Sequence, residues 1–222
     1  MMVRAEEERH RYGDAPCIPE LIAIVGVGAL HVVLELAASV TAATIYNSAV
    51  CVAVIGYLVW RARRSPGVLR AWGMRLDNLG RALAAQLAFV AVAALPILAY
   101  GYFTGRLPLP GTFWLTAAFY PLWGTAQQFA LQILVARNLT GLLTRPWPLA
   151  LAAAALFAVS HVPQYDLVLL TFLGGTGFTI LYRRQPNLWA VGLAHGLLGA
   201  LAYYLVVGRD PGATILGLFS GG

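Results

Sequence analysis

The feature that most constrains this chain is a series of apolar runs, each close to the length needed to cross a lipid bilayer. A helix rises about 1.5 Å per residue, so about 20 apolar residues span the hydrocarbon core. Hydrophobic side chains make up 59% of the 222 residues and charged ones only 11%. Soluble domains carry about 25% charged residues. No segment alternates apolar and polar residues over about ten positions, as barrel strands do. The sequence therefore predicts an all-α, multi-pass transmembrane helical bundle.

Seven segments are predicted to cross the membrane. They cover residues 18–37, 42–60, 79–103, 112–137, 147–163, 165–182 and 187–207. The boundaries are set by where an apolar run gives way to charged or turn-forming residues, except between the first two spans, where no Pro or Gly marks the turn inside ELAASVTAATIYNSAV. No internal repeat or low-complexity segment is found, so residues 18–222 are predicted to form a single transmembrane domain. Residues 1–17 are predicted to be a cytoplasmic N-terminal segment.

All 15 basic residues are arginine, and their distribution predicts the orientation of the chain. With the N-terminus in the cytoplasm, only Arg106 and Arg209 fall on the outer side. Cytoplasmic loops of membrane proteins carry this excess of basic residues. We therefore predict an inner (plasma) membrane protein with its N-terminus inside and its C-terminus outside. Nucleic acid is not an expected partner, because no basic stripe is interleaved with stacking aromatics.

A few polar side chains fall inside these spans, where each is expected to face the bundle interior. An ionisable group at that depth costs up to about 3 kcal/mol on insertion scales. They are His31 and Glu35 in the first span, Gln127, Gln128 and Gln132 in the fourth, His161 at the end of the fifth and His195 in the seventh.

The three glutamines form one polar edge of the fourth span. Gln128 and Gln132 are four positions apart and share a helix face, while Gln127 lies about 100° round from Gln128. One interpretation is adhesion between helices, since glutamines hydrogen-bond across membrane helices. However, an antiparallel hairpin would bring Gln127 and His161 to similar depth, and His195 could reach the same layer. The alternative interpretation is a site built from two imidazoles and the amides.

His31 and Glu35 are also four positions apart and share a face of the first span. The simplest expectation is a self-neutralising ion pair or hydrogen bond that allows both to be buried. The alternative is that the pair joins the central polar cluster.

Three segments carry a resemblance to a known family. They are QQFALQ at residues 127–132, FAVSHVP at 157–163 and NLWAVGLAHGLLGAL at 187–201. In order and spacing they resemble the signature motifs of the CPBP family of CAAX-protease and bacteriocin-processing intramembrane endopeptidases, also called the ABI family. The resemblance covers a core at about residues 72–205, beginning where WGMRLDNL is similar to the family's segment before the next helix.

The match differs from motif to motif. The family's second motif, Phe, three residues, then His, is intact as Phe157 and His161. The third, His, three residues, then a polar residue, keeps His195 but has Gly199 at the polar position.

The first family motif is Glu-Glu, three residues, then Arg. Here Gln127 and Gln128 stand at the glutamate positions and Gln132 at the arginine position. The resemblance implies that the first Glu activates water while the histidines orient it and stabilise the oxyanion as a peptide bond is cleaved. Glutamine has no useful basicity, and loss of a general base costs about 10² to 10⁴ in rate.

The favoured expectation is therefore a degenerate member, a pseudoprotease, that binds a membrane-embedded or prenylated peptide, a lipid or a partner membrane protein without cutting it. One alternative is an active intramembrane peptidase in which His161, His195 or Glu35 serves as the base. Another is a metal or haem protein that uses His31, Glu35, His161 and His195 as ligands. Apart from that alternative, no cofactor is expected.

Overall fold

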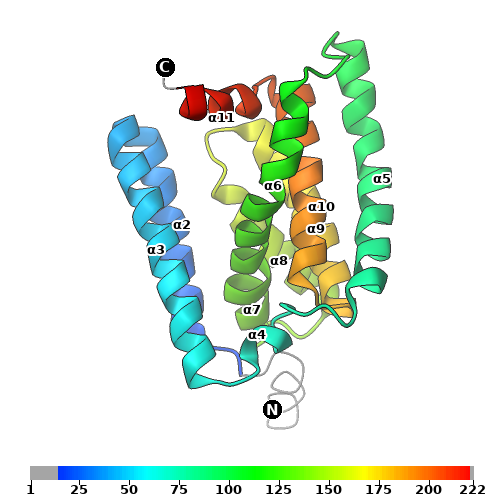
Figure 1. Cartoon of the computed structure of the whole chain (residues 1–222). Coiled ribbons are helices and arrows are strands. Elements are labelled where there is room, and N and C mark those ends of the chain that lie inside the picture. Colours follow the sequence, from blue (N-terminus) through cyan, green and yellow to red (C-terminus); the bar gives the residue numbers. More distant parts are fainter. Residues whose placement is uncertain (1–14, 221–222) are drawn as a thin grey trace.

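The computed structural model describes residues 15–220, and within that range every regular element is a helix (Figure 1). In chain order these are α2 (Ile18–Ala37), α3 (Val40–Arg64), α4 (Val68–Ala71), α5 (Leu79–Phe103), α6 (Thr112–Phe129), the π-helical segment η1 (Ala130–Ala136), α7 (Arg137–Leu139), α8 (Pro146–Val159), α9 (Tyr165–Arg184), α10 (Leu188–Ala202), the π-helical segment η2 (Tyr203–Val207) and α11 (Pro211–Ser220). The predicted all-α class is confirmed. Most of the predicted segment 1–17 lies outside the described residues.

Five of the described helical runs are long and apolar enough to cross a membrane. They are α2, residues 41–64 of α3, α5, α9 and the run through α10 and η2. A further rod is continuous from α6 through η1 to α7, and α8 is apolar but has only 14 residues. These elements follow the order of the predicted spans. The number of crossings, seven, stays a prediction.

The ends of the bundle differ in their arginine content. Arginines gather in the last turns of α3 and α9. These turns, and the α4–α5 connection that holds Arg75, lie at the end of the bundle where α4 is labelled (Figure 1). The α5–α6 and α10–α11 connections, which hold Arg106 and Arg209, lie at the opposite end. The predicted orientation requires this separation. Which end faces the cytoplasm stays a prediction.

α2 and α3 form a hairpin that leans away from the other helices (Figure 1). Ser39 caps the start of α3, its Oγ accepting a hydrogen bond from the backbone N–H of Ala42 at 3.3 Å. Leu21 is the buried residue of α2, and no described side chain in the spanning part of α3 is buried. The hairpin touches the rest of the molecule chiefly where α2 meets η1, α7 and α8. Most of its apolar surface is therefore left for lipid.

α6 and α10 pack together more extensively than the other described pairs of helices. A Cβ atom added at Gly192 would lie 2.0 Å from Oγ1 of Thr125, and one at Gly196 would lie 2.5 Å from the backbone nitrogen of Pro121. Real contacts are never that short, so both positions require glycine. Small residues allow membrane helices to approach closely and gain dispersion energy. The close approach brings Gln127 and Gln128 of α6 against α10.

The segment before α5 anchors the start of α10. The backbone N–H of Leu188 donates to the carbonyl of Gly73 at 2.8 Å. Nδ2 of Asn187 donates to the carbonyl of Arg75 at 2.8 Å, while its Oδ1 accepts from the backbone N–H of Ala190 and caps α10. Gly73 has a φ of +81°, a conformation that glycine adopts without strain. These bonds fix the register of α10.

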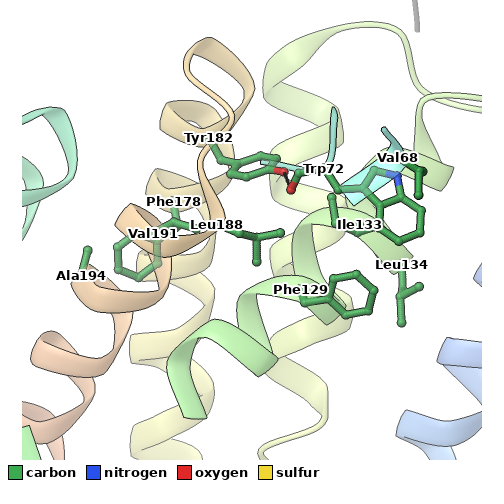
Figure 2. Close-up of a cluster of buried hydrophobic side chains, with 10 residues drawn as sticks. All are labelled: Val68, Trp72, Phe129, Ile133, Leu134, Phe178, Tyr182, Leu188, Val191 and Ala194. Atoms are coloured by element: carbon green, nitrogen blue, oxygen red, sulfur yellow. Dashed lines mark hydrogen bonds between the residues drawn. The ribbon is translucent and has the colours of Figure 1, made fainter. Parts of the chain in front are cut away.

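A buried hydrophobic cluster beside this anchor joins α4, α6, η1, α9 and α10, and Figure 2 shows its ten side chains. Trp72 is fully buried, and the hydroxyl of Tyr182 donates to its carbonyl oxygen at 2.8 Å. Three members of the cluster, Phe129, Phe178 and Ala194, each adjoin in sequence a polar residue of the site described below. Packing of this cluster therefore positions the polar side chains.

Candidate functional site

His195 lies within a chain of hydrogen bonds made entirely by uncharged side chains. Its Nε2 lies 2.9 Å from Oε1 of Gln127, and its Nδ1 lies 2.9 Å from Nε2 of Gln128. The amide nitrogen of Gln132 donates to Oε1 of Gln128 at 2.9 Å and to Oγ1 of Thr179 at 3.2 Å. Gln128, Gln132 and Thr179 are buried. The structure thus brings together four of the predicted site residues and adds Thr179, which sequence analysis missed.

The donors and acceptors in this chain run in one direction. Oε1 of Gln128 accepts from Gln132, so the amide nitrogen of Gln128 is the atom that faces His195. An amide nitrogen can only donate, which makes Nδ1 of His195 the acceptor and places the ring proton on Nε2. That proton is then donated to Oε1 of Gln127. His195 is therefore neutral, and both of its ring nitrogens are engaged.

His161 approaches the same region from the turn between α8 and α9. Its Nδ1 lies 3.1 Å from the carbonyl oxygen of Phe157, so Nδ1 carries the proton and Nε2 is the lone-pair nitrogen. The ring of Phe157 contacts both imidazoles, with centroids 5.0 Å from His161 and 6.0 Å from His195. The spacing of Phe, three residues, then His therefore places an aromatic ring beside both histidines.

The two imidazoles line one cavity of about 560 Å³. Helices α5, α6, α9 and α10 bound it together with η2. Gln127, His161 and His195 contribute polar groups, whereas most of the lining is aliphatic and aromatic. This size and composition are typical of sites that bind small, mainly apolar molecules.

Gly199, at the position where the resemblance calls for a polar residue, also lines the cavity. A Cβ atom added there would meet Cδ1 of Tyr120 at 3.7 Å, an ordinary contact. Unlike Gly192 and Gly196, this glycine is not required by helix packing. Its missing side chain instead leaves space in the cavity.

Asp166 is a lining residue that the sequence analysis did not single out. It stands in the first turn of α9 and is exposed, so the part of the lining that it forms reaches the surface. Among the described residues that line the cavity, Asp166 alone is an acid. Acidic residues are common in the first turn of any helix because of the helix dipole. Its position in the sequence therefore gave no sign of a second role.

The expected pairing of His31 with Glu35 is not formed. Glu35 is exposed, and no ion pair or hydrogen bond joins it to His31 in the described part of the chain. His31 stacks on Tyr46 instead, with centroids 6.3 Å apart. Neither residue lines the cavity. The prediction that Glu35 faces the interior is therefore wrong, because spacing of four places two Cβ atoms close together without turning the side chains toward each other. The position of Glu35 gives no support to its role as a surrogate base.

The metal alternative is not supported by the positions of its proposed ligands. Within residues 15–220, no three His, Cys, Asp or Glu side chains are grouped as metal ligands. The set His31, Glu35, His161 and His195 therefore does not form one coordination site.

A second buried polar cluster lies at the boundary of η1 and α7. Arg137 is fully buried, and its Nη2 forms an ion pair with Oε2 of Glu20 on α2. Arg137 also donates to Oδ1 of Asn138, at 3.2 Å from Nε and 3.0 Å from Nη2, and its guanidinium lies 5.3 Å from the ring centroid of Trp72. Sequence analysis treated Arg137 only as a marker of the inner side. The cluster joins the α2–α3 hairpin to the rest of the protein.

The chain matches a known protein family. The model of a family described as Type II CAAX prenyl endopeptidase Rce1-like matches residues 9–201. That range contains all three motifs and begins well before residue 72, where the resemblance was expected to start. No curated protein and no solved structure matches the chain.

Proposed function

We propose, from the premise that the chain belongs to the Type II CAAX prenyl endopeptidase Rce1-like family, that it holds a membrane-embedded ligand in its cavity without hydrolysing a peptide bond. The chain is a CAAX-protease-like integral membrane protein. The ligand we expect is a prenylated or otherwise membrane-embedded peptide, a lipid, or a segment of a partner membrane protein. The proposed site residues are Gln127, Gln128, Gln132, His161 and His195.

The uncharged hydrogen-bond chain around His195 is the observation that carries this proposal. Hydrolysis requires a group that takes a proton from the attacking water. Gln127 and Gln128 cannot do so, and the lone pair on Nδ1 of His195 already accepts from the Gln128 amide. A positioned base contributes about 10² to 10⁴ in rate, and the cavity has no carboxylate at either position of the first motif.

The same geometry leaves groups that suit binding. Oε1 of Gln127 accepts from His195, while its amide nitrogen makes no hydrogen bond to the described residues. Because Gln127 lines the cavity, this nitrogen is able to donate to a carbonyl oxygen of a ligand. Apolar walls around one oriented donor resemble the usual design of a small-ligand pocket.

The test restores the charged motif. Parent protein and the variant Q127E/Q128E/Q132R are placed in nanodiscs with a prenylated peptide, and binding and cleavage are both measured. The parent is expected to bind the peptide and release it intact, whereas the restored variant is expected to cleave it. The matched control is the restored variant with His195→Ala added, which should bind without cleaving. Cleavage by the parent, abolished by His195→Ala, would overturn the proposal.

A second candidate, an active peptidase, is favoured by one observation at His161. Its Nε2 makes no hydrogen bond to the described residues, and the ring lines the cavity together with Asp166. In this reading His161 is the base, since both nitrogens of His195 are engaged. The same assay separates the two candidates: the parent would cleave, and His161→Ala would abolish cleavage while leaving peptide binding measurable.

The remaining assignments follow from the sequence. We propose one transmembrane domain over residues 18–222 with its family core at about 72–205, seated in the inner (plasma) membrane with the N-terminus inside. The arginine excess on one side of the predicted spans supports this orientation.

A further inference from the structure

We infer that the cavity selects a positively charged amphiphile, a hydrocarbon chain that carries an ammonium group, through the carboxylate of Asp166. The inference rests on the proposed function, because it names the class of ligand that the cavity holds. It concerns a residue outside the three family motifs.

The charge of the cavity lining favours a cationic ligand. Asp166 is the acid among the described lining residues, and no arginine lines the cavity. The whole chain contains no lysine. His195 is neutral in the hydrogen-bond chain described above, and position 132, where the family carries Arg, holds an uncharged amide. The lining itself therefore carries one negative charge and no basic side chain, and the guanidinium of Arg106 lies just outside it, 5.7 Å from the ring centroid of Tyr100.

The negative charge of Asp166 changes the electrostatic energy of a charged ligand that binds beside it. An anionic group held beside Asp166 would bring like charges together at the edge of an apolar cavity. Coulomb interactions there are several times stronger than in water, because the effective dielectric constant is lower. An ammonium group reverses the sign of this interaction and is attracted.

Aromatic rings near the cavity support the same class of ligand. Tyr120, Trp123 and Tyr203 line it, and the rings of Tyr120 and Tyr203 meet edge to face with centroids 5.6 Å apart. Aromatic faces attract ammonium groups, quaternary ones included. The aliphatic part of the lining, on α9 above all, suits the hydrocarbon chain.

Asp166 also has a simpler possible role, favourable interaction with the dipole of α9. That role predicts lower stability on mutation and no effect on the choice of ligand. It does not account for the place of Asp166 in the cavity lining. Stability and selectivity are therefore measured together.

The experiment uses three amphiphiles that share one saturated hydrocarbon chain and end in trimethylammonium, hydroxyl or sulfonate, so that the charges stay fixed with pH. Binding to the full chain in nanodiscs of zwitterionic lipid is measured by displacement of a fluorescent fatty probe. The parent is expected to prefer the ammonium over the sulfonate by about tenfold or more. Asp166→Asn should remove this preference, and Asp166→Glu should keep it. Glu35→Gln, which changes an exposed carboxylate outside the cavity, is the matched control and should leave it unchanged.

Each outcome decides a different point. Equal affinity of the parent for all three amphiphiles would overturn the charge selection and leave the ligand-holding function standing. If Asp166→Asn is less stable than the parent but still prefers the ammonium over the sulfonate, Asp166 acts on the helix dipole alone and the inference is overturned. Gly199→Leu fills the cavity, so ligand that binds in the cavity should no longer bind to this variant. If none of the three amphiphiles shows binding that this variant loses, the proposed function itself is contradicted.

Discussion

The two buried polar clusters on the rod formed by α6, η1 and α7 differ in that only one carries charge. Arg137 pairs with Glu20 and lies over Trp72, and it does not line the cavity. A short distance before it on the same rod, Gln128 and Gln132 form a neutral hydrogen-bond chain that ends at the cavity. Both clusters are buried, and both join the rod to other helices.

The contrast separates two uses of buried polarity. Breaking a buried ion pair leaves an uncompensated charge and costs about 3–5 kcal/mol. Losing one neutral hydrogen bond costs about 1 kcal/mol. The chain thus keeps charge where a hairpin must be fastened to the bundle. It carries amides at the positions where the motif resemblance implies catalytic charge.

The largest effect is expected from Arg137→Met. The carboxylate of Glu20 would lose its cationic partner and keep only the hydrogen bond from Nδ2 of Asn138 at 3.3 Å among those described. The free energy of unfolding should fall by about 3 kcal/mol, the low end of the range because Glu20 is partly exposed. Unfolding by denaturing detergent measures the loss. Adding Glu20→Gln removes the stranded charge and should restore part of the stability. Equal stability of parent and Arg137→Met would remove the distinction between the two clusters.

The next effect tests the glycine contact that holds the neutral cluster together. In Gly196→Ala the new Cβ would lie 2.5 Å from the backbone nitrogen of Pro121, so α6 must move away from α10. We expect a loss of about 2 kcal/mol and weaker ligand binding, since Gln127 would separate from His195. Gly199→Ala, whose Cβ has room, is the control and should match the parent in stability. If both variants behave alike, the close approach of the helices is not what assembles the site.

The direction of the hydrogen bonds predicts an asymmetry between the two adjacent glutamines. Gln127→Glu keeps an acceptor for the Nε2 proton of His195, whereas Gln128→Glu places an acceptor opposite an acceptor. Gln128→Glu should therefore move a proton onto Nδ1 of His195. If the proton does not move, the free energy of unfolding should fall by about 1–3 kcal/mol, because two acceptors face each other. Nitrogen-15 spectra of histidine-labelled protein distinguish the tautomers directly. Identical spectra for the two variants would show that the chain does not set the state of His195.

A smaller effect is expected at Thr179. Thr179→Val removes the hydroxyl that accepts from Gln132 and should lower the free energy of unfolding by about 1 kcal/mol. Thr176→Val is the matched control, since Thr176 bonds only to the carbonyl of Phe172 on its own helix, and its loss should be smaller. A reversed order would indicate that Thr179 contributes by packing alone.

The smallest effect belongs to an exposed ion pair in the connection before α5. A hydrogen bond from Arg75 is the main reason that the pKa of Asp77 is lowered to about 2. A lowered folded-state pKa means that this pair stabilises the fold above the ordinary pKa and that the contribution is lost as the pH falls toward 2. As the pH falls from the ordinary aspartate pKa toward 2, the thermal unfolding midpoint of Asp77→Asn should therefore change less than that of the parent. An equal change in both would assign the acid sensitivity to other carboxylates.

Much of the architecture follows from the sequence, because the bilayer sets the length of each helix and requires buried partners for polar groups. That is why Gln127, Gln128 and His195 were expected in one layer, and the structure places them in hydrogen-bond contact. Their catalytic or binding roles remain predictions. The π-helical segment was not foreseen, because residues 131–139 are all buried and no polar face marks the wider turn.

Other residues were missed because their sequence context has an ordinary explanation. Threonine hydroxyls in helices usually bond to their own backbone, as Thr171 and Thr176 do, and only packing against η1 gives Thr179 a different partner. Glu20 stands at the start of a helix and Arg137 near a membrane edge, both usual positions. Their pairing depends on how the hairpin docks, which a local pattern does not encode.

The central claim, that the site holds its ligand and does not cut it, is tested most directly by recovering the ligand. A prenylated peptide is incubated with an excess of the parent protein in nanodiscs through many hours, then extracted and examined by mass spectrometry. The account predicts that the peptide co-purifies with the protein and is recovered whole. Recovery of a peptide shortened at its C-terminus, from the parent and not from His161→Ala or His195→Ala, would contradict it.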